Sequence, residues 1–125
     1  MNEETREFLQ RRAFEASPYE VCGFIMEDGS IVEIRNVATN RIKGFRMDRD
    51  EMIQKLSDRA DFIKGIWHTH PSGTIHPSHT DLNAIRMGAI QRNWDYWIVT
   101  ASSVSLYIPN HYAPQDNLFW SEFAK

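Results

Sequence analysis

The chain has 125 residues and a formal net charge of −3 at pH 7. This length suits one domain with its own core, so we predict a single domain over residues 1–125. The hydrophobic share of 42% and the charged share of 25% are those of an ordinary globular protein, and the small negative charge offers no attraction to nucleic acid or anionic membranes.

The N-terminal residues and the cysteine content argue against a secreted or membrane-spanning protein. Residues 1–12 are mostly polar and lack the apolar segment of a secretory signal, and no apolar run approaches the length of a membrane span. The one cysteine, Cys22, cannot form an intramolecular disulfide and lies mid-strand, which favours a small buried residue over a nucleophile. We predict a cytoplasmic location, or the host cytoplasm for a phage-encoded protein.

Hydrophobic patterns in the first part of the chain predict a helix followed by a β-hairpin. Residues 3–16 carry a partial apolar stripe, and a Ser-Pro pair ends this helix because the residue before proline avoids the helical region. Residues 21–26 form a continuous apolar run, typical of a strand buried on both faces. An Asp-Gly turn then leads into a second strand over residues 31–37.

The remaining chain predicts alternating helices and strands. Asp48 caps a helix whose apolar stripe is Met52, Ile53, Leu56 and Ala60. The other predicted elements are strands at residues 45–47, 62–68, 94–99 and 104–108, and helices at residues 78–91 and 110–125. The basic cluster Arg41, Lys43, Arg46 and Arg49 is expected to be a solvated loop. The order predicts a mixed α/β fold, with a mixed sheet flanked by helices.

Residues 67–81, with the sequence WHTHPSGTIHPSHTD, contain four of the five histidines. Side chains two apart on a strand point to the same side, so His68 and His70 can aim at one point. A tight loop over residues 71–77 could fold the next helix back, so that Asp81 joins them. Two nitrogens and one carboxylate oxygen, with a fourth position open, form the arrangement of catalytic zinc.

A reading without metal predicts the same residues. Ser78-x-x-Asp81 before an apolar run is also an ordinary helix-capping box. The combination of the histidine pair, this box and the flanking prolines favours the metal site. His79 is expected to be a surface residue, and His76 either lines the mouth of the site or binds metal adventitiously.

This stretch resembles the signature of the JAMM (Jab/MPN) metallopeptidase family, H-x-H-P-x6-S-x2-D. The matching positions are His68, His70, Pro71, Ser78 and Asp81. The family also has a glutamate near its first strand, often before a Cys-Gly pair, and Glu20 precedes Val21-Cys22-Gly23. The resemblance implies a small prokaryotic or phage-type member with a cytidine-deaminase-like MPN/JAMM fold.

The resemblance also implies the roles of the site residues. His68, His70 and Asp81 would hold Zn²⁺, Glu20 would act as general acid and base, and Ser78 would donate to the oxyanion. We therefore predict a zinc-dependent peptidase or isopeptidase, acting on a protein or peptide after the C-terminal tail of a ubiquitin-like or sulfur-carrier protein. The alternative is a phage tail-assembly protein or a non-catalytic MPN scaffold. No nucleic-acid or membrane partner is expected, and a homodimer is compatible with the sequence.

Overall fold

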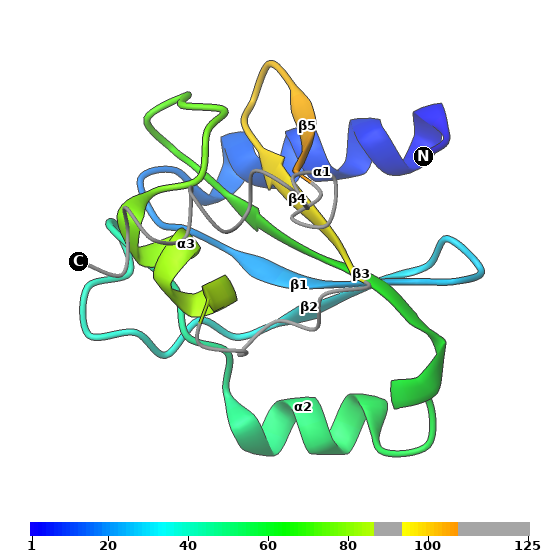
Figure 1. Cartoon of the computed structure of the whole chain (residues 1–125). Helices are drawn as coiled ribbons and strands as arrows, with labels where there is room; N and C mark the ends of the chain where they lie inside the picture. Colours follow the sequence, from blue (N-terminus) through cyan, green and yellow to red (C-terminus); the bar gives the residue numbers. More distant parts are fainter. Residues whose placement is uncertain (87–93, 108–125) are drawn as a thin grey trace.

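A computed structural model of the chain describes residues 1–86 and 94–107. These residues form one five-stranded sheet of order β2-β1-β3-β4-β5, with helices on both sides (Figure 1). The elements are α1 (Glu3–Ala16), β1 (Cys22–Met26), β2 (Ile31–Ile34), α2 (Arg49–Leu56), η1 (Ala60–Phe62), β3 (Ile63–Thr69), α3 (His79–Arg86), β4 (Asp95–Val99) and β5 (Val104–Tyr107). The predicted fold class, a mixed sheet flanked by helices, is confirmed.

The directions of the strands bring the beginning of β1 to the end of β3. Strand β1 is antiparallel to β2 and to β3, with Cys22 opposite His68 in the register. Strand β3 is parallel to β4, and β4 is antiparallel to β5. A residue just before β1 and residues at the end of β3 therefore meet at one end of the sheet, although they are far apart in the sequence.

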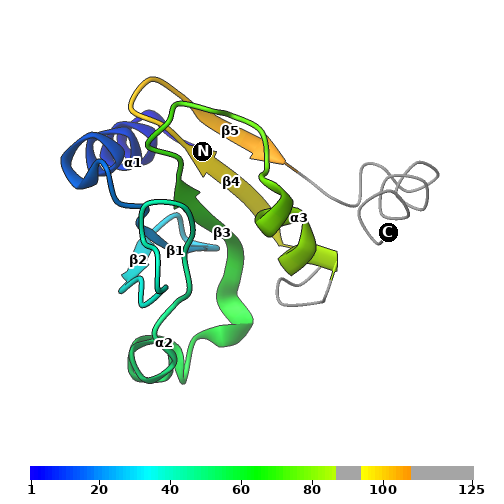
Figure 2. The same cartoon turned by 90° about the vertical axis from the view of Figure 1, so that its left-hand side faces the viewer.

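Helix α1 covers one face of the sheet (Figure 2). The side chain of Asn2 accepts a hydrogen bond from the backbone N–H of Thr5 at 2.8 Å, which satisfies a free donor in the first turn of the helix. Leu9 and Ala13 are buried against Trp67 of β3. Trp67 is fully buried, as expected for a core residue on the face opposite His68.

The opposite face of the sheet packs against α2. Phe24, Ile66 and Ile98 of three neighbouring strands form an apolar cluster with Leu56 of the helix. The Asp48 side chain caps α2 by accepting from the N–H of Asp50, as predicted for this helix start. The two faces of β3 therefore pack against different helices, and His68 lies on the face that packs against α2.

Several predicted boundaries are wrong. Strand β2 ends at Ile34, and residues 45–47 contribute only an isolated bridge between Asn36 and Met47. The reason is the side-chain amide of Asn36, which donates hydrogen bonds to the carbonyls of Glu20 and Gly44. These bonds connect two loops and take the place of further backbone pairing between β1 and β2. Predictions for residues 87–91 and 108–125 lie outside the described residues.

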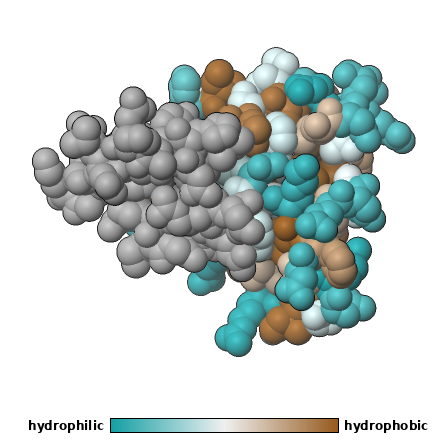
Figure 3. Space-filling model, turned by 45° about the vertical axis from the view of Figure 1, so that its right-hand side comes forward, coloured by the Kyte–Doolittle hydropathy of each residue, from teal (hydrophilic) through white to brown (hydrophobic). Residues whose placement is uncertain are grey.

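The surface is mixed in character. On the side seen in Figure 3, hydrophobic residues are interspersed with hydrophilic ones. Ile53, predicted in the buried stripe of α2, is 54% exposed, and Arg41 and Lys43 are exposed as expected for a solvated loop. Within residues 1–86 and 94–107, no helix combines the length and the apolar character that crossing a membrane requires.

Gly23 of β1 leaves no room for a side chain, and we expect Gly23→Ala to destabilise the fold. A Cβ there would lie 2.1 Å from the carbonyl oxygen of Val32 and 2.9 Å from Cα of Glu33, so the backbone would have to shift. Overpacking of this kind costs about 1–3 kcal/mol of unfolding free energy. Urea denaturation measures the change, with Gly44→Ala as the matched control because nothing lies within 4 Å of its added Cβ. Equal stability of the two variants would contradict this packing.

Candidate metal centre

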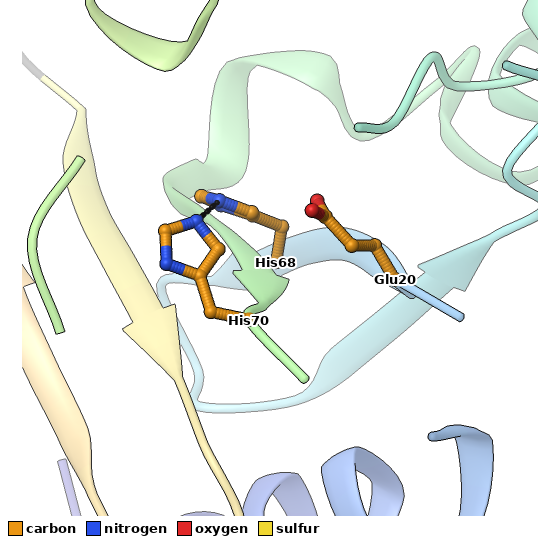
Figure 4. Close-up of side chains that lie close together, drawn as sticks. All are labelled: Glu20, His68 and His70. Carbon is orange, nitrogen blue, oxygen red and sulfur yellow. Dashed lines mark hydrogen bonds between the residues drawn. The ribbon is translucent and has the colours of Figure 1, made fainter. Parts of the chain in front are cut away.

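The end of β3 presents two imidazoles to one point. His68 is the penultimate residue of the strand and is fully buried, and His70 follows the strand and is 7% exposed. Because they are two residues apart, their rings lie on the same side, and their Nε2 atoms are 2.8 Å apart (Figure 4). The structure therefore places the two nitrogens where the sequence pattern predicts them.

The loop after β3 fixes the orientation of His70. The carbonyl of Thr74 lies 2.8 Å from Nδ1 of His70 and can only accept, so Nδ1 carries a proton, and in the neutral ring Nε2 keeps the lone pair that a metal ion requires. Gly73, at φ 86°, makes the turn that returns this carbonyl to the ring. A positive φ is strained for other residues, which explains a glycine at this position.

The beginning of α3 brings a carboxylate to the same point. Ser78 and Asp81 form the predicted capping box, since the N–H of Asp81 donates to Oγ of Ser78 at 3.0 Å and the N–H of Ser78 donates to Oδ2 of Asp81 at 2.9 Å. The same Oδ2 lies 3.2 Å from Nε2 of His68 and 3.1 Å from Nε2 of His70. The cap and the convergence on the histidines are thus one structure rather than alternatives.

These three atoms fit a tetrahedral metal ion closely. Zinc bonds of roughly 2.0–2.1 Å hold two ligand atoms of a tetrahedron roughly 3.3 Å apart. The three separations in the protein are 2.8, 3.1 and 3.2 Å. An outward movement of a few tenths of an ångström converts the cluster into a ligand set, and two imidazole nitrogens with a carboxylate match the donors that zinc prefers.

Glu20 approaches the histidines from the segment before β1 (Figure 4). A carboxylate oxygen of Glu20 and one ring nitrogen each of His68 and His70 all lie within 4.8 Å of one another, a grouping that could hold a metal ion. Its backbone is held on both sides, because its N–H donates to the carbonyl of Arg41 at 2.7 Å and its carbonyl accepts from Asn36 at 2.9 Å. The side chain is 7% exposed.

The two carboxylates have different electrostatic environments. Burial raises the pKa of Glu20 to about 7, with the charge of Asp81 adding to the shift and that of His70 opposing it. Burial by itself would also raise the pKa of Asp81, but hydrogen bonds from His68 and His70 hold that pKa well below its usual range. Asp81 therefore stays ionised at neutral pH, whereas Glu20, with a pKa of about 7, can take up or release a proton near neutrality.

The histidines also differ from each other. Complete burial lowers the pKa of His68, so its neutral form, the form that binds a metal, is favoured. For His70, burial opposes protonation, but the hydrogen bonds with Asp81 and Thr74 and the negative charges of Asp81 and Glu20 together outweigh it and raise the pKa.

An open cleft of about 580 Å³ leads to this centre. Its lining includes Glu20, His70, His76 and Ser78. Ser78 accepts the capping hydrogen bond through Oγ, which leaves its O–H free to donate into the cleft. His79 is exposed, as expected for a surface residue, and His76 is exposed as well.

Two aromatic residues at the centre were not predicted there. Phe45 stacks on the ring of His68 with centroids 4.6 Å apart, and the ring of Tyr96 is 5.4 Å from the same imidazole. A loop residue and a core-strand residue gave no sequence signal of this contact. Cys22 is buried, and burial raises its pKa to about 12, which agrees with a structural residue rather than a nucleophile.

Comparisons with known proteins found a matching family and a protein of similar fold. The chain matches the family of prokaryotic homologs of the JAB domain over residues 3–120. It is also similar in fold to the protein DSY2949 from Desulfitobacterium hafniense, known from a solution structure, with 21% sequence identity, a TM-score of 0.64, and coverage of 84% of this chain and 78% of that one. None of the curated proteins matches the sequence. With nearly its whole length matched, the chain belongs to the prokaryotic JAB-domain family.

Proposed function

We propose that the protein is a zinc-dependent peptidase or isopeptidase that hydrolyses an amide bond. The observation that carries this proposal is the convergence of His68, His70 and Asp81, with the proton-exchanging carboxyl of Glu20 beside them. When zinc is bound, it polarises the substrate carbonyl and lowers the pKa of a water molecule toward about 7.

The residues of the chain have separate roles in this reaction. His68, His70 and Asp81 hold the metal, and the Ser78 N–H and the Thr74 carbonyl keep the carboxylate and one imidazole in orientation. Glu20 accepts the proton of the attacking water and passes it to the leaving amine, a task that suits a carboxyl with a pKa of about 7. The O–H of Ser78 donates to the oxyanion that develops on the substrate carbonyl.

The burial of the centre favours a substrate with little side-chain bulk next to the bond that is cleaved. His70 and Asp81 are 7% and 6% exposed, so a carbonyl can reach them only where little side-chain bulk surrounds it. An extended Gly-Gly segment has no side chains. This is consistent with cleavage after the C-terminal tail of a ubiquitin-like or sulfur-carrier protein, which we propose as the substrate class.

Two measurements on the purified protein test the proposal. Elemental mass spectrometry is expected to find about one zinc per chain after the metal is supplied. A fusion joined through a Gly-Gly tail is expected to be cleaved, with activity lost on chelation and restored by zinc. Absence of zinc would refute the metal centre. Bound zinc with no cleavage of any Gly-Gly substrate would instead favour a non-catalytic scaffold or a tail-assembly role.

A further inference from the structure

Tyr96 of β4 lies behind the candidate metal centre. It is fully buried, and its position opposite Ile66 in the parallel β3–β4 pair puts it on the face that carries His68. Its ring packs against the imidazole of His68 at 5.4 Å, and it lines a pocket of about 440 Å³ together with Asp81. Tyr96 therefore borders two of the three proposed ligands.

The hydroxyl of Tyr96 has no hydrogen-bond partner in the described part of the chain. A buried hydroxyl without a partner is costly, and most buried polar atoms have one. A tyrosine hydroxyl is a hydrogen-bond donor at neutral pH, and the carboxylate of Asp81 lines the same pocket as Tyr96. The structure thus holds an unused donor at the edge of the centre.

Asp81 has an unused acceptor to match. Its side-chain contacts with His68, His70 and the N–H of Ser78 all involve Oδ2. Among residues 1–83 and 94–107, no hydrogen bond reaches its other oxygen, Oδ1. A carboxylate that binds a metal through one oxygen is usually fixed by a hydrogen bond to its surroundings, and loss of such a partner weakens metal binding.

We propose that Tyr96 is a positioning residue for the metal, which donates its O–H to Oδ1 of Asp81 while its ring supports His68. A metal held by His68, His70 and Asp81 would take the place of the hydrogen bonds between Oδ2 and the histidines. The carboxylate then depends on Ser78 and Tyr96 for its orientation. This inference rests on the proposed ligand set but assigns a residue that the ligand set does not contain.

The test compares wild type and Tyr96→Phe, which removes only the hydroxyl. The zinc dissociation constant, measured by competition with a chromogenic chelator, is expected to rise about 10–100-fold, as for other outer partners of metal ligands. The metal-free variant is expected to unfold at the same urea concentration as wild type or a higher one, because the removed hydroxyl has no partner there. Tyr107→Phe is the matched control, since Tyr107 packs edge-on against Tyr96 from the next strand, and its zinc affinity is expected to be unchanged.

Each other outcome has a definite meaning. Zinc affinity of Tyr96→Phe equal to that of wild type overturns the inference and leaves the ligand set intact. Lower stability of the metal-free variant with unchanged affinity shows a purely structural tyrosine and also overturns it. Failure of wild type itself to bind zinc refutes the proposed function, and the role of Tyr96 with it.

Discussion

Glu20→Gln is expected to lower the turnover number by about 10²–10⁴-fold while zinc stays bound, because the amide keeps the size of the side chain but cannot take up a proton. The side chain of Glu20 makes no hydrogen bond within the described residues, so the substitution removes no structural contact. Its carboxyl, with a pKa of about 7, is the proposed acid and base of the centre. Steady-state kinetics on the Gly-Gly fusion measure the loss, and elemental analysis of the same sample measures the zinc.

The pair of readouts separates two roles that the geometry allows for Glu20. It lies close enough to both histidines to be counted with them as a ligand, whereas Asp81 is nearer and keeps its charge. Loss of zinc in Glu20→Gln would make Glu20 a ligand, and full activity would exclude it as the acid and base. Glu27→Gln is the control, because Glu27 is exposed just beyond the other end of β1, and it should behave as wild type.

His68→Ala and Asp81→Ala are expected to lose the metal. Each removes one of the three proposed protein ligands, so zinc affinity should fall by more than the about 10–100-fold that an outer partner contributes. A second readout follows from linkage. Zinc at about 100 times its dissociation constant stabilises a protein that binds it by about 2.7 kcal/mol, and neither variant should show this increase in thermal unfolding.

A control and a milder variant keep this test decisive. His79→Ala changes an exposed histidine at the first position of α3 and should retain zinc. Because His68 is fully buried between Phe45 and Tyr96, its truncation leaves a cavity, and circular dichroism must show that the variant is folded. Asp81→Asn keeps the side-chain size and covers the case in which His68→Ala does not fold. Full zinc occupancy in a folded variant would refute that residue as a ligand.

Local patterns in the sequence were sufficient for most of the fold. The helix predicted over residues 3–16 is α1 itself, and the apolar run before the Asp-Gly turn is β1. Predictions were wrong where a contact from elsewhere in the chain decides the structure. The Asn36 amide ends the backbone pairing of β2 with β1. Ile53 faces solvent because no other described element packs against the outer side of α2.

The residues of the candidate centre also differ in whether local sequence patterns predict their positions. His68, His70, Ser78 and Asp81 lie within 14 positions of one another, so spacing and secondary structure were enough to predict their meeting. The nearness of Glu20 depends on the antiparallel pairing of β1 and β3, which spacing does not reveal, and the family resemblance supplied it. Neither the spacing nor the family resemblance predicted the positions of Phe45 and Tyr96. Phe45 reaches His68 from a loop, and Tyr96 reaches it through the parallel pairing of β3 with β4.

The position of the β1–β2 turn has a practical consequence for protein engineering. Glu20 and His68 sit at one end of the sheet, whereas residues 27–30 close the hairpin at the other end, where the Asp28 carboxylate accepts from both the N–H and the O–H of Ser30. A fluorescent label, an affinity tag or a tether to a surface can be introduced into this turn at the length of a full strand from the chemistry. Variation in the length of the same turn among related sequences would be tolerated for the same reason, so insertions there carry little information about activity.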